Sequence, residues 1–141
     1  TAVGICLGSG YAGEASAPLG ERITAVLGDL TACHDASSLA LAASVGAHLD
    51  IVVADDGGGG IFATLEHGRA ASPDAYDRWF GVAQAVNYEA LAAAYGVAFA
   101  RTDEPQELES LLARPASGPR LIHAPIERAA HLYAAIREIV N

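Results

Sequence analysis

The chain contains neither lysine nor methionine, and its 8 basic residues, all arginine, are outnumbered by 17 acidic residues. Without lysine the chain cannot form a Schiff base, and it cannot build a phosphate-binding loop of the Walker type. The formal net charge of −9, with no basic cluster, argues against a nucleic-acid surface. We therefore expect no nucleic-acid partner.

Cysteine and long apolar runs are also scarce. Cys6 and Cys33 are the only cysteines and lack metal-site spacing, which favours free thiols in a cytoplasmic protein. No apolar run approaches the roughly 20 residues of a membrane-spanning helix, so we expect no integral membrane segment. The opening residues 1–10 lack the basic start of a signal peptide and resemble a helix cut in its middle. We expect residues 1–141 to be a single domain of a longer polypeptide, truncated at its N-terminus.

What the chain does contain is an alternation of short apolar runs with helical patterns. The apolar runs predict strands, and the helical patterns are separated by turn signals. Alternating strands and helices indicate an α/β fold, a Rossmann-like parallel sheet with helices on both faces. The expected strands are 24–27, 49–53, 97–100 and 120–124; the expected helices are 2–12, 38–45, 61–65, 87–95, 105–113 and 128–140, with a polar loop over 69–78.

Acidic residues follow the first two of these strands. Asp29 comes after Gly28, and Asp55-Asp56 is followed by four glycines. Each motif alone is typical of an ordinary turn, but open α/β sheets bind ligands at strand carboxyl ends, and Mg²⁺ is commonly shared between carboxylates and phosphate. We expect the side chains of Asp29 and Asp56 and the carbonyl of Gly58 to hold Mg²⁺ against a phosphate, with glycine amides facing the anionic oxygens.

This pair of motifs resembles the signature of thiamine diphosphate enzymes, Gly-Asp-Gly followed some 25 to 30 residues later by Asn-Asn. The form Gly28-Asp-Leu-Thr, then Val52-Val-Ala-Asp-Asp-Gly-Gly-Gly-Gly-Ile-Phe62, is most similar to the 2-succinyl-5-enolpyruvyl-6-hydroxy-3-cyclohexene-1-carboxylate (SEPHCHC) synthase family, MenD, in its actinobacterial form. The likeness continues through 78–81, 91–96 and 131–136. It implies that the chain is the C-terminal, diphosphate-binding domain of such an enzyme.

The resemblance also implies roles for individual residues. Asp29, Asp56 and Gly58 would bind Mg²⁺. Ile61, Phe62 and Leu65 would form the apolar wall of the active site. The implied contacts of thiamine diphosphate are Gly28, Asp29, Leu30, Thr31, Asp56, Gly58, Gly59 and Ile61.

For the whole enzyme, the resemblance implies decarboxylation of 2-oxoglutarate and conjugate addition to isochorismate in menaquinone biosynthesis. The cofactor supplies the organic chemistry and the protein holds it and excludes water. The implied partner is the N-terminal pyrimidine-binding domain of a neighbouring subunit, in a homodimer or homotetramer. Because the activating glutamate and the substrate-binding arginines belong to absent domains, we expect the isolated chain to be inactive.

Two departures from the family pattern stand out. The family's Asn-Asn is Asp55-Asp56 here, which adds negative charge that attracts a metal but repels diphosphate if no metal is present. Where related enzymes often have Gly-Thr-Pro-His, residues 81–84 are Gly-Val-Ala-Gln, so a substrate role of this segment is not implied.

Other functions are also compatible with the sequence. Acetolactate synthases and 2-oxoacid decarboxylases share the thiamine diphosphate pattern, although Leu30 and the Ile61-Phe62 pair favour the menaquinone enzyme. A receiver-type acidic pocket is disfavoured because it needs a lysine, and a non-catalytic α/β module is a further alternative. His34 is as compatible with a structural role as with diphosphate binding, Arg69 and Arg78 are candidate substrate contacts, and His123, like the remaining histidines, is expected to have a surface or packing role.

Overall fold

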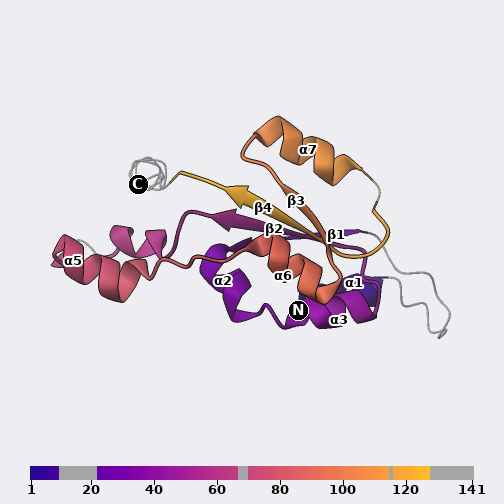
Figure 1. Ribbon diagram of the computed structural model, residues 1–141, viewed down its shortest axis with the longest axis horizontal. Helices are drawn as coiled ribbons and strands as arrows, with labels where there is room; N and C mark the ends of the chain where they lie inside the picture. Colours follow the sequence, from indigo (N-terminus) through magenta and orange to yellow (C-terminus); the bar gives the residue numbers. More distant parts are fainter. Residues whose placement is uncertain (10–21, 67–69, 115, 128–141) are drawn as a thin grey trace.

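The computed structural model describes residues 1–9, 22–66, 70–114 and 116–127 (Figure 1). Four parallel strands form one sheet in the order β1-β2-β4-β3. Their bounds are β1 Ile23–Gly28, β2 Leu49–Asp55, β3 Ala98–Arg101 and β4 Arg120–Pro125. The predicted α/β fold is confirmed, and every predicted strand is present.

The helices lie on both faces of the sheet. On one face, α1, α3 and α6 pack over a core that includes Cys6, Ala42 and Ala92, and on the other α7 covers Val52 and Ile122 (Figure 1). The bounds are α1 Ala2–Ser9, α2 Asp29–His34, α3 Ser38–Ser44, α5 Pro73–Tyr76, α6 Tyr88–Tyr95 and α7 Pro105–Ala113. In the described part of the chain no helix is long and apolar enough to span a membrane.

Local sequence explains several of these boundaries. The side chain of Asn87 accepts a hydrogen bond from the amide of Ala90 and begins α6, and Gly96 ends it in the left-handed conformation, φ 68°. Pro105 occupies the first turn of α7, where a missing amide costs nothing. The predicted helix over 128–140 lies outside the described residues.

Three charged residues connect the strands at the amino end of the sheet. The Asp50 carboxylate on β2 is 1% exposed and receives Arg22 Nε at 2.6 Å and Arg120 Nε at 2.8 Å. Arg22 also donates to the carbonyl of Ala116, at 2.9 Å, and Arg120 to that of Leu111, at 2.7 Å. This buried triad joins β1, β2 and β4 to the segment that precedes β4.

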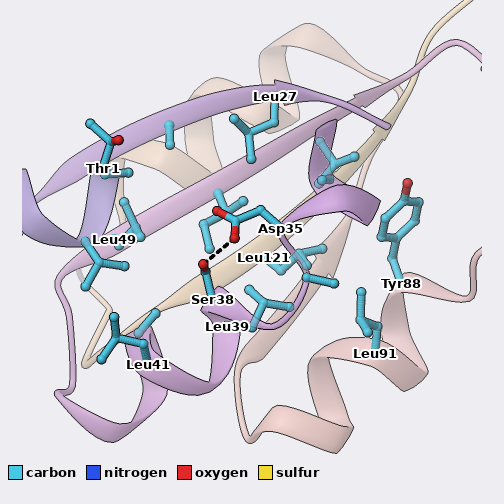
Figure 2. A pocket seen from close by; sticks show the side chains of 18 of the residues that line it. Thr1, Leu27, Asp35, Ser38, Leu39, Leu41, Leu49, Tyr88, Leu91 and Leu121 are labelled. Carbon is cyan, nitrogen blue, oxygen red and sulfur yellow. Dashed lines mark hydrogen bonds between the residues drawn. The ribbon is translucent and has the colours of Figure 1, made fainter. Parts of the chain in front are cut away.

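An apolar cavity of about 330 Å³ lies between the sheet and the helices of the α1 face. Figure 2 shows Leu27, Leu49 and Leu121 of the strands facing Leu39 and other helical side chains across it. Ser38 and Asp35, which also line it, are joined by a hydrogen bond of 2.5 Å from the Ser38 hydroxyl to the Asp35 carboxylate (Figure 2). The inner layer is therefore apolar but not completely filled.

Candidate functional site

Two acidic segments meet at the carboxyl edge of the sheet. Gly28 is the last residue of β1 and pairs with Ala54 of β2, so Asp29 and Asp55 follow directly on adjacent strand ends. The residues between these positions form a crossover that brings the two segments together. The sequence predicted that Asp29 and Asp56 lie at adjacent strand ends; the register shows that the two strands are adjacent and parallel, with Asp56 directly after the last residue of β2.

Asp29 begins α2 and is buried, with 3% of its surface exposed. Its Oδ1 accepts the amide of Leu30 at 2.8 Å, while its Oδ2 is the one buried side-chain oxygen among the described residues that has no hydrogen-bond partner. Burial raises the pKa of Asp29 above its usual value; the Leu30 amide opposes this rise, and the charges of Asp55 and Asp56 add to it. A buried carboxylate oxygen without a donor is a ligand position for a cation.

The glycine run after Asp56 brings the backbone close to the acidic side chains. Gly58 has φ 126°, a conformation that only glycine adopts without strain. A Cβ atom on Gly60 would lie 2.0 Å from Asp56 Oδ2, so the carboxylate occupies the space that any other residue would fill. The carbonyl of Gly58 accepts the amide of Gly60 at 3.0 Å and keeps a second lone pair.

Asp55 has a different set of contacts from its two acidic neighbours. Its Oδ1 accepts the amide of Gly57 at 3.0 Å, and its Oδ2 lies 2.8 Å from His123 Nε2 on β4. The imidazole of His123 packs against the buried ring of Tyr88, with 4.6 Å between ring centroids. Burial raises the pKa of Tyr88, and the neighbouring Cys33 raises it further.

Residues 60–66 and 70–82 form an excursion beyond the carboxyl ends of the strands, on the side where α5 lies (Figure 1). It consists of the 3-10 helix η1 Gly60–Thr64, the helix α5 and the π-helix η2 Asp77–Gly81. Its ends meet where the Gly59 amide donates to the Gly81 carbonyl, at 2.6 Å, and where the Tyr76 hydroxyl donates to the Gly59 carbonyl, at 3.0 Å. The predicted polar loop over 69–78 is therefore wrong from Pro73 onwards.

The three residues expected to form an apolar wall are open to solvent. Ile61, Phe62 and Leu65 are 56%, 37% and 47% exposed, and the Phe62 ring packs against Phe80, with 6.0 Å between centroids. Phe62 also lines an open cavity of about 780 Å³ at the mouth of the site. Its other lining residues are Leu30, Cys33, His34, Trp79, Phe80, Val82 and Gln84.

The remaining predicted residues fall into three groups. Gly28 and Thr31 are exposed at the end of β1 and the start of α2, and Gly59 is buried within the loop. Arg78 lies over the ring of Trp79, 5.0 Å from its centroid, rather than in the cavity. Arg69 lies outside the described residues.

The donor set fits a divalent cation of the magnesium type. Asp29 Oδ2 has no hydrogen-bond partner, and Asp56 and the Gly58 carbonyl could supply further oxygen ligands from the adjacent loop. In the described part of the chain no three acidic, histidine or cysteine side chains converge on one point, so protein carboxylates alone do not form a complete cage. A site of this kind is completed by phosphate oxygens and water.

Sequence reasoning did not find the bond between His123 and Asp55. The sequence did contain an indication of it: Asp55 stands where the family pattern has asparagine. A carboxylate at this position calls for a hydrogen-bond donor nearby, which the side-chain amide of asparagine would not require. The partner is on a strand far along the chain, and only the β2–β4 pairing brings it close.

The fold and this edge define a class of protein. Residues 1–124 match the family described as thiamine pyrophosphate enzyme, C-terminal TPP binding domain. The chain belongs to this family and is a thiamine diphosphate-binding domain.

Three curated relatives of the chain are all named SEPHCHC synthase. The chain is 38% identical, over its whole length, to the SEPHCHC synthase of Paenarthrobacter aurescens, and 40% and 41% identical, over 91% of its length, to those of Nocardioides sp. and Clavibacter michiganensis. It covers 24%, 22% and 22% of those proteins, so it spans about a quarter of the length of the curated relatives it matches. It is therefore similar to one segment of those enzymes.

A solved structure shows the same fold. The thiamine diphosphate-dependent 4-hydroxybenzoylformate decarboxylase of Rhodococcus jostii superposes with a TM-score of 0.67 at 22% identity, covering 89% of this chain and 22% of that one.

Proposed function

We propose that this chain is the diphosphate-binding domain of a SEPHCHC synthase and that its carboxyl edge binds Mg²⁺ and the diphosphate of thiamine diphosphate. The observation that carries the proposal is the buried Asp29 Oδ2, which lacks a hydrogen-bond partner next to the Asp56 loop. A carboxylate desolvated in this way is stabilised by a cation that it ligates directly.

Each part of the edge has a role in this proposal. Asp29 and Asp56 contribute carboxylate oxygens and Gly58 its carbonyl to the metal, and Gly28, Leu30, Thr31 and Gly59 contact the diphosphate. Ile61, Phe62 and Leu65 present apolar surface toward the reactive end of the cofactor and exclude water there. When bound, thiamine diphosphate supplies the chemistry of 2-oxoacid decarboxylation and carbon–carbon bond formation.

The whole enzyme, in this proposal, decarboxylates 2-oxoglutarate and adds the product to isochorismate. The open cavity beside Phe62 and Trp79 would face the pyrimidine-binding domain of a neighbouring subunit in a homodimer or homotetramer. The isolated chain is then inactive, and substantial decarboxylation of 2-oxoglutarate by it would contradict this. A cytoplasmic location stays a prediction.

Calorimetric titration of thiamine diphosphate, with and without Mg²⁺, tests the site. We expect binding that requires Mg²⁺, is lost in Asp56→Ala and is kept in Glu109→Ala, a matched change at an exposed position on α7. Binding that does not need Mg²⁺, or that survives Asp56→Ala, would contradict the ligand assignment. Assays of the whole enzyme with isochorismate and with pyruvate as acceptor separate the proposed reaction from that of an acetolactate synthase.

A further inference from the structure

The Asp55 carboxylate is fully engaged inside the protein. One oxygen fixes the turn at Gly57 and the other receives His123. The side chains of Asp55 and His123 are 21% and 16% exposed, so their mutual bond is partly shielded from water, whereas the bond to the Gly57 amide lies at the surface. Because an ionised carboxylate only accepts hydrogen bonds, Nε2 of His123 carries the proton and donates.

The imidazole of His123 is itself held in place. The β2–β4 pairing places His123 opposite Val53, two residues before Asp55, and Ile126 just beyond β4 donates its amide to the Asp55 carbonyl at 2.8 Å. Tyr88, which is 3% exposed, packs against the ring. The donor therefore reaches Asp55 from a rigid element, which is the arrangement that gives a supporting hydrogen bond its precision.

The hydrogen bond between His123 and Asp55 affects the repulsion among the carboxylates at the edge of the sheet. The charges of Asp55 and Asp56 both raise the pKa of Asp29, so the three carboxylates are mutually repulsive. A donor on Asp55 keeps that carboxylate turned away and occupied with the Gly57 turn. Asp56, the next residue, is thereby left to face the cation together with Asp29.

We propose that His123 is a positioning residue for the metal site, which directs Asp55 to support the Asp56–Gly60 loop instead of ligating the cation. The proposal rests on the proposed function of this edge. Without the donor, Asp55 releases the Gly57 turn and the Asp56 carboxylate moves with it. Loss of such an outer-shell partner typically weakens metal affinity about 10–100-fold.

Two substitutions separate the donor from the ring. His123→Phe keeps an aromatic ring against Tyr88 but removes the donor, whereas His123→Gln keeps an amide donor and removes the ring. We expect the Kd for Mg²⁺, measured by calorimetry in the presence of thiamine diphosphate, to rise about 10–100-fold in His123→Phe and to stay near the wild-type value in His123→Gln. Asp55→Asn combined with His123→Phe should recover most of the affinity, because the unpaired charge is gone.

A packing role would give the reverse order, with His123→Phe close to wild type and His123→Gln weakened. That order, or equal Kd values for wild type and a folded His123→Phe, would overturn the proposal. Circular dichroism establishes whether each variant is folded. If His123→Phe does not fold, the test uses His123→Gln alone: an affinity for Mg²⁺ as weak as that of Asp56→Ala would overturn the proposal. Metal-independent binding by the wild-type chain contradicts the proposed function itself, so the two failures are distinguishable.

Discussion

The two ends of the sheet treat a buried carboxylate in opposite ways. At the amino end, Asp50 receives hydrogen bonds from two arginines. At the carboxyl end, backbone amides and no arginine face Asp29: its Oδ1 accepts the Leu30 amide, the Gly58 amide also lowers its pKa, and its Oδ2 has no hydrogen-bond partner of normal geometry among the described residues. The carboxylate at the amino end is thus paired with cationic side chains of the same chain, whereas the carboxylate at the carboxyl end is not, and a cation bound there remains our proposal.

The pKa values follow the same contrast. Burial alone would raise the pKa of Asp50, but the hydrogen bonds and charges of Arg22 and Arg120 outweigh it and lower that pKa. Burial dominates at Asp29, whose pKa is raised. The two arginines therefore outweigh the cost of burying ionised Asp50, whereas the backbone amides near Asp29 do not outweigh the cost of its burial.

The largest effect is expected at the amino end. Asp50→Asn removes the negative charge between two arginines and one of the two oxygens that accept from them, so the free energy of unfolding should fall by about 3–5 kcal/mol, as is typical when a buried charge loses its partner. Urea denaturation measures this loss. Asp103→Asn, at an exposed position, is the matched control, and an equally small loss in both variants would show that the triad is not stabilising.

The amino end should also set part of the acid sensitivity. Because the folded pKa of Asp50 lies below the unfolded value of about 3.9, its stabilisation is fully present above that value. It is lost as the pH falls through the lowered folded pKa. Unfolding curves collected below pH 5 should therefore be less pH-dependent in Asp50→Asn than in the wild type, and parallel curves would contradict this.

The next effect belongs to the carboxyl end. Thiamine diphosphate with Mg²⁺, at 100 times the Kd, should raise the free energy of unfolding by about 2.7 kcal/mol, since ligands that bind only the folded state stabilise it by mass action. Thermal denaturation with and without the ligands measures the gain. It should persist in Asp103→Asn and disappear in Asp29→Asn, and an unchanged gain in the latter would remove Asp29 from the site.

When no ligand is present, Asp29→Asn should raise the free energy of unfolding, whereas Asp50→Asn lowers it. The substitution removes a buried charge and keeps an oxygen for the Leu30 amide, so the ligand-free protein should gain about 1 kcal/mol of stability. Urea denaturation without Mg²⁺ tests this. A loss comparable to that of Asp50→Asn would mean that the two ends do not differ in the way the structure indicates.

The smallest effect is expected in the excursion beyond the carboxyl edge. Val82 adopts φ 39° and ψ 52°, a left-handed conformation that is strained for a β-branched residue. Val82→Gly relieves this strain at the expense of greater freedom in the unfolded chain, so the net gain should be about 0.5 kcal/mol. Ala83→Gly, which removes no such strain, should lower stability, and equal effects of the two would argue against strain at Val82.

The two central strands, β2 and β4, were predictable because burial on both faces produces nearly continuous apolar runs. β2 shows this directly, since its first five residues are all buried. The beginning of α6 at Asn87 and of α7 at Pro105 also followed from local capping chemistry. The position of Asp29 and Asp56 at neighbouring strand ends followed from parallel pairing of consecutive strands.

Other features could not be predicted because their cause is local competition or distant contact. α2 was missed because Gly28-Asp29 is equally typical of a turn, and only the structure shows that Asp29 itself starts the helix. Ser72-Pro73 carried the signal for α5, with Ser72 accepting the amide of Ala75. The π-helix, the Asp50 triad and the His123 bond depend on tertiary contacts that no short segment encodes.

The position of Trp79 has an optical consequence. It is the only tryptophan of the chain, it is 68% exposed, and it lines the open cavity beside Phe62 with the Arg78 guanidinium over its ring. Tryptophan emission therefore comes from one indole at the mouth of the candidate site. The wavelength and intensity of this emission depend on solvent access at that one place. Intrinsic tryptophan fluorescence can therefore detect a ligand or protein domain that covers the cavity.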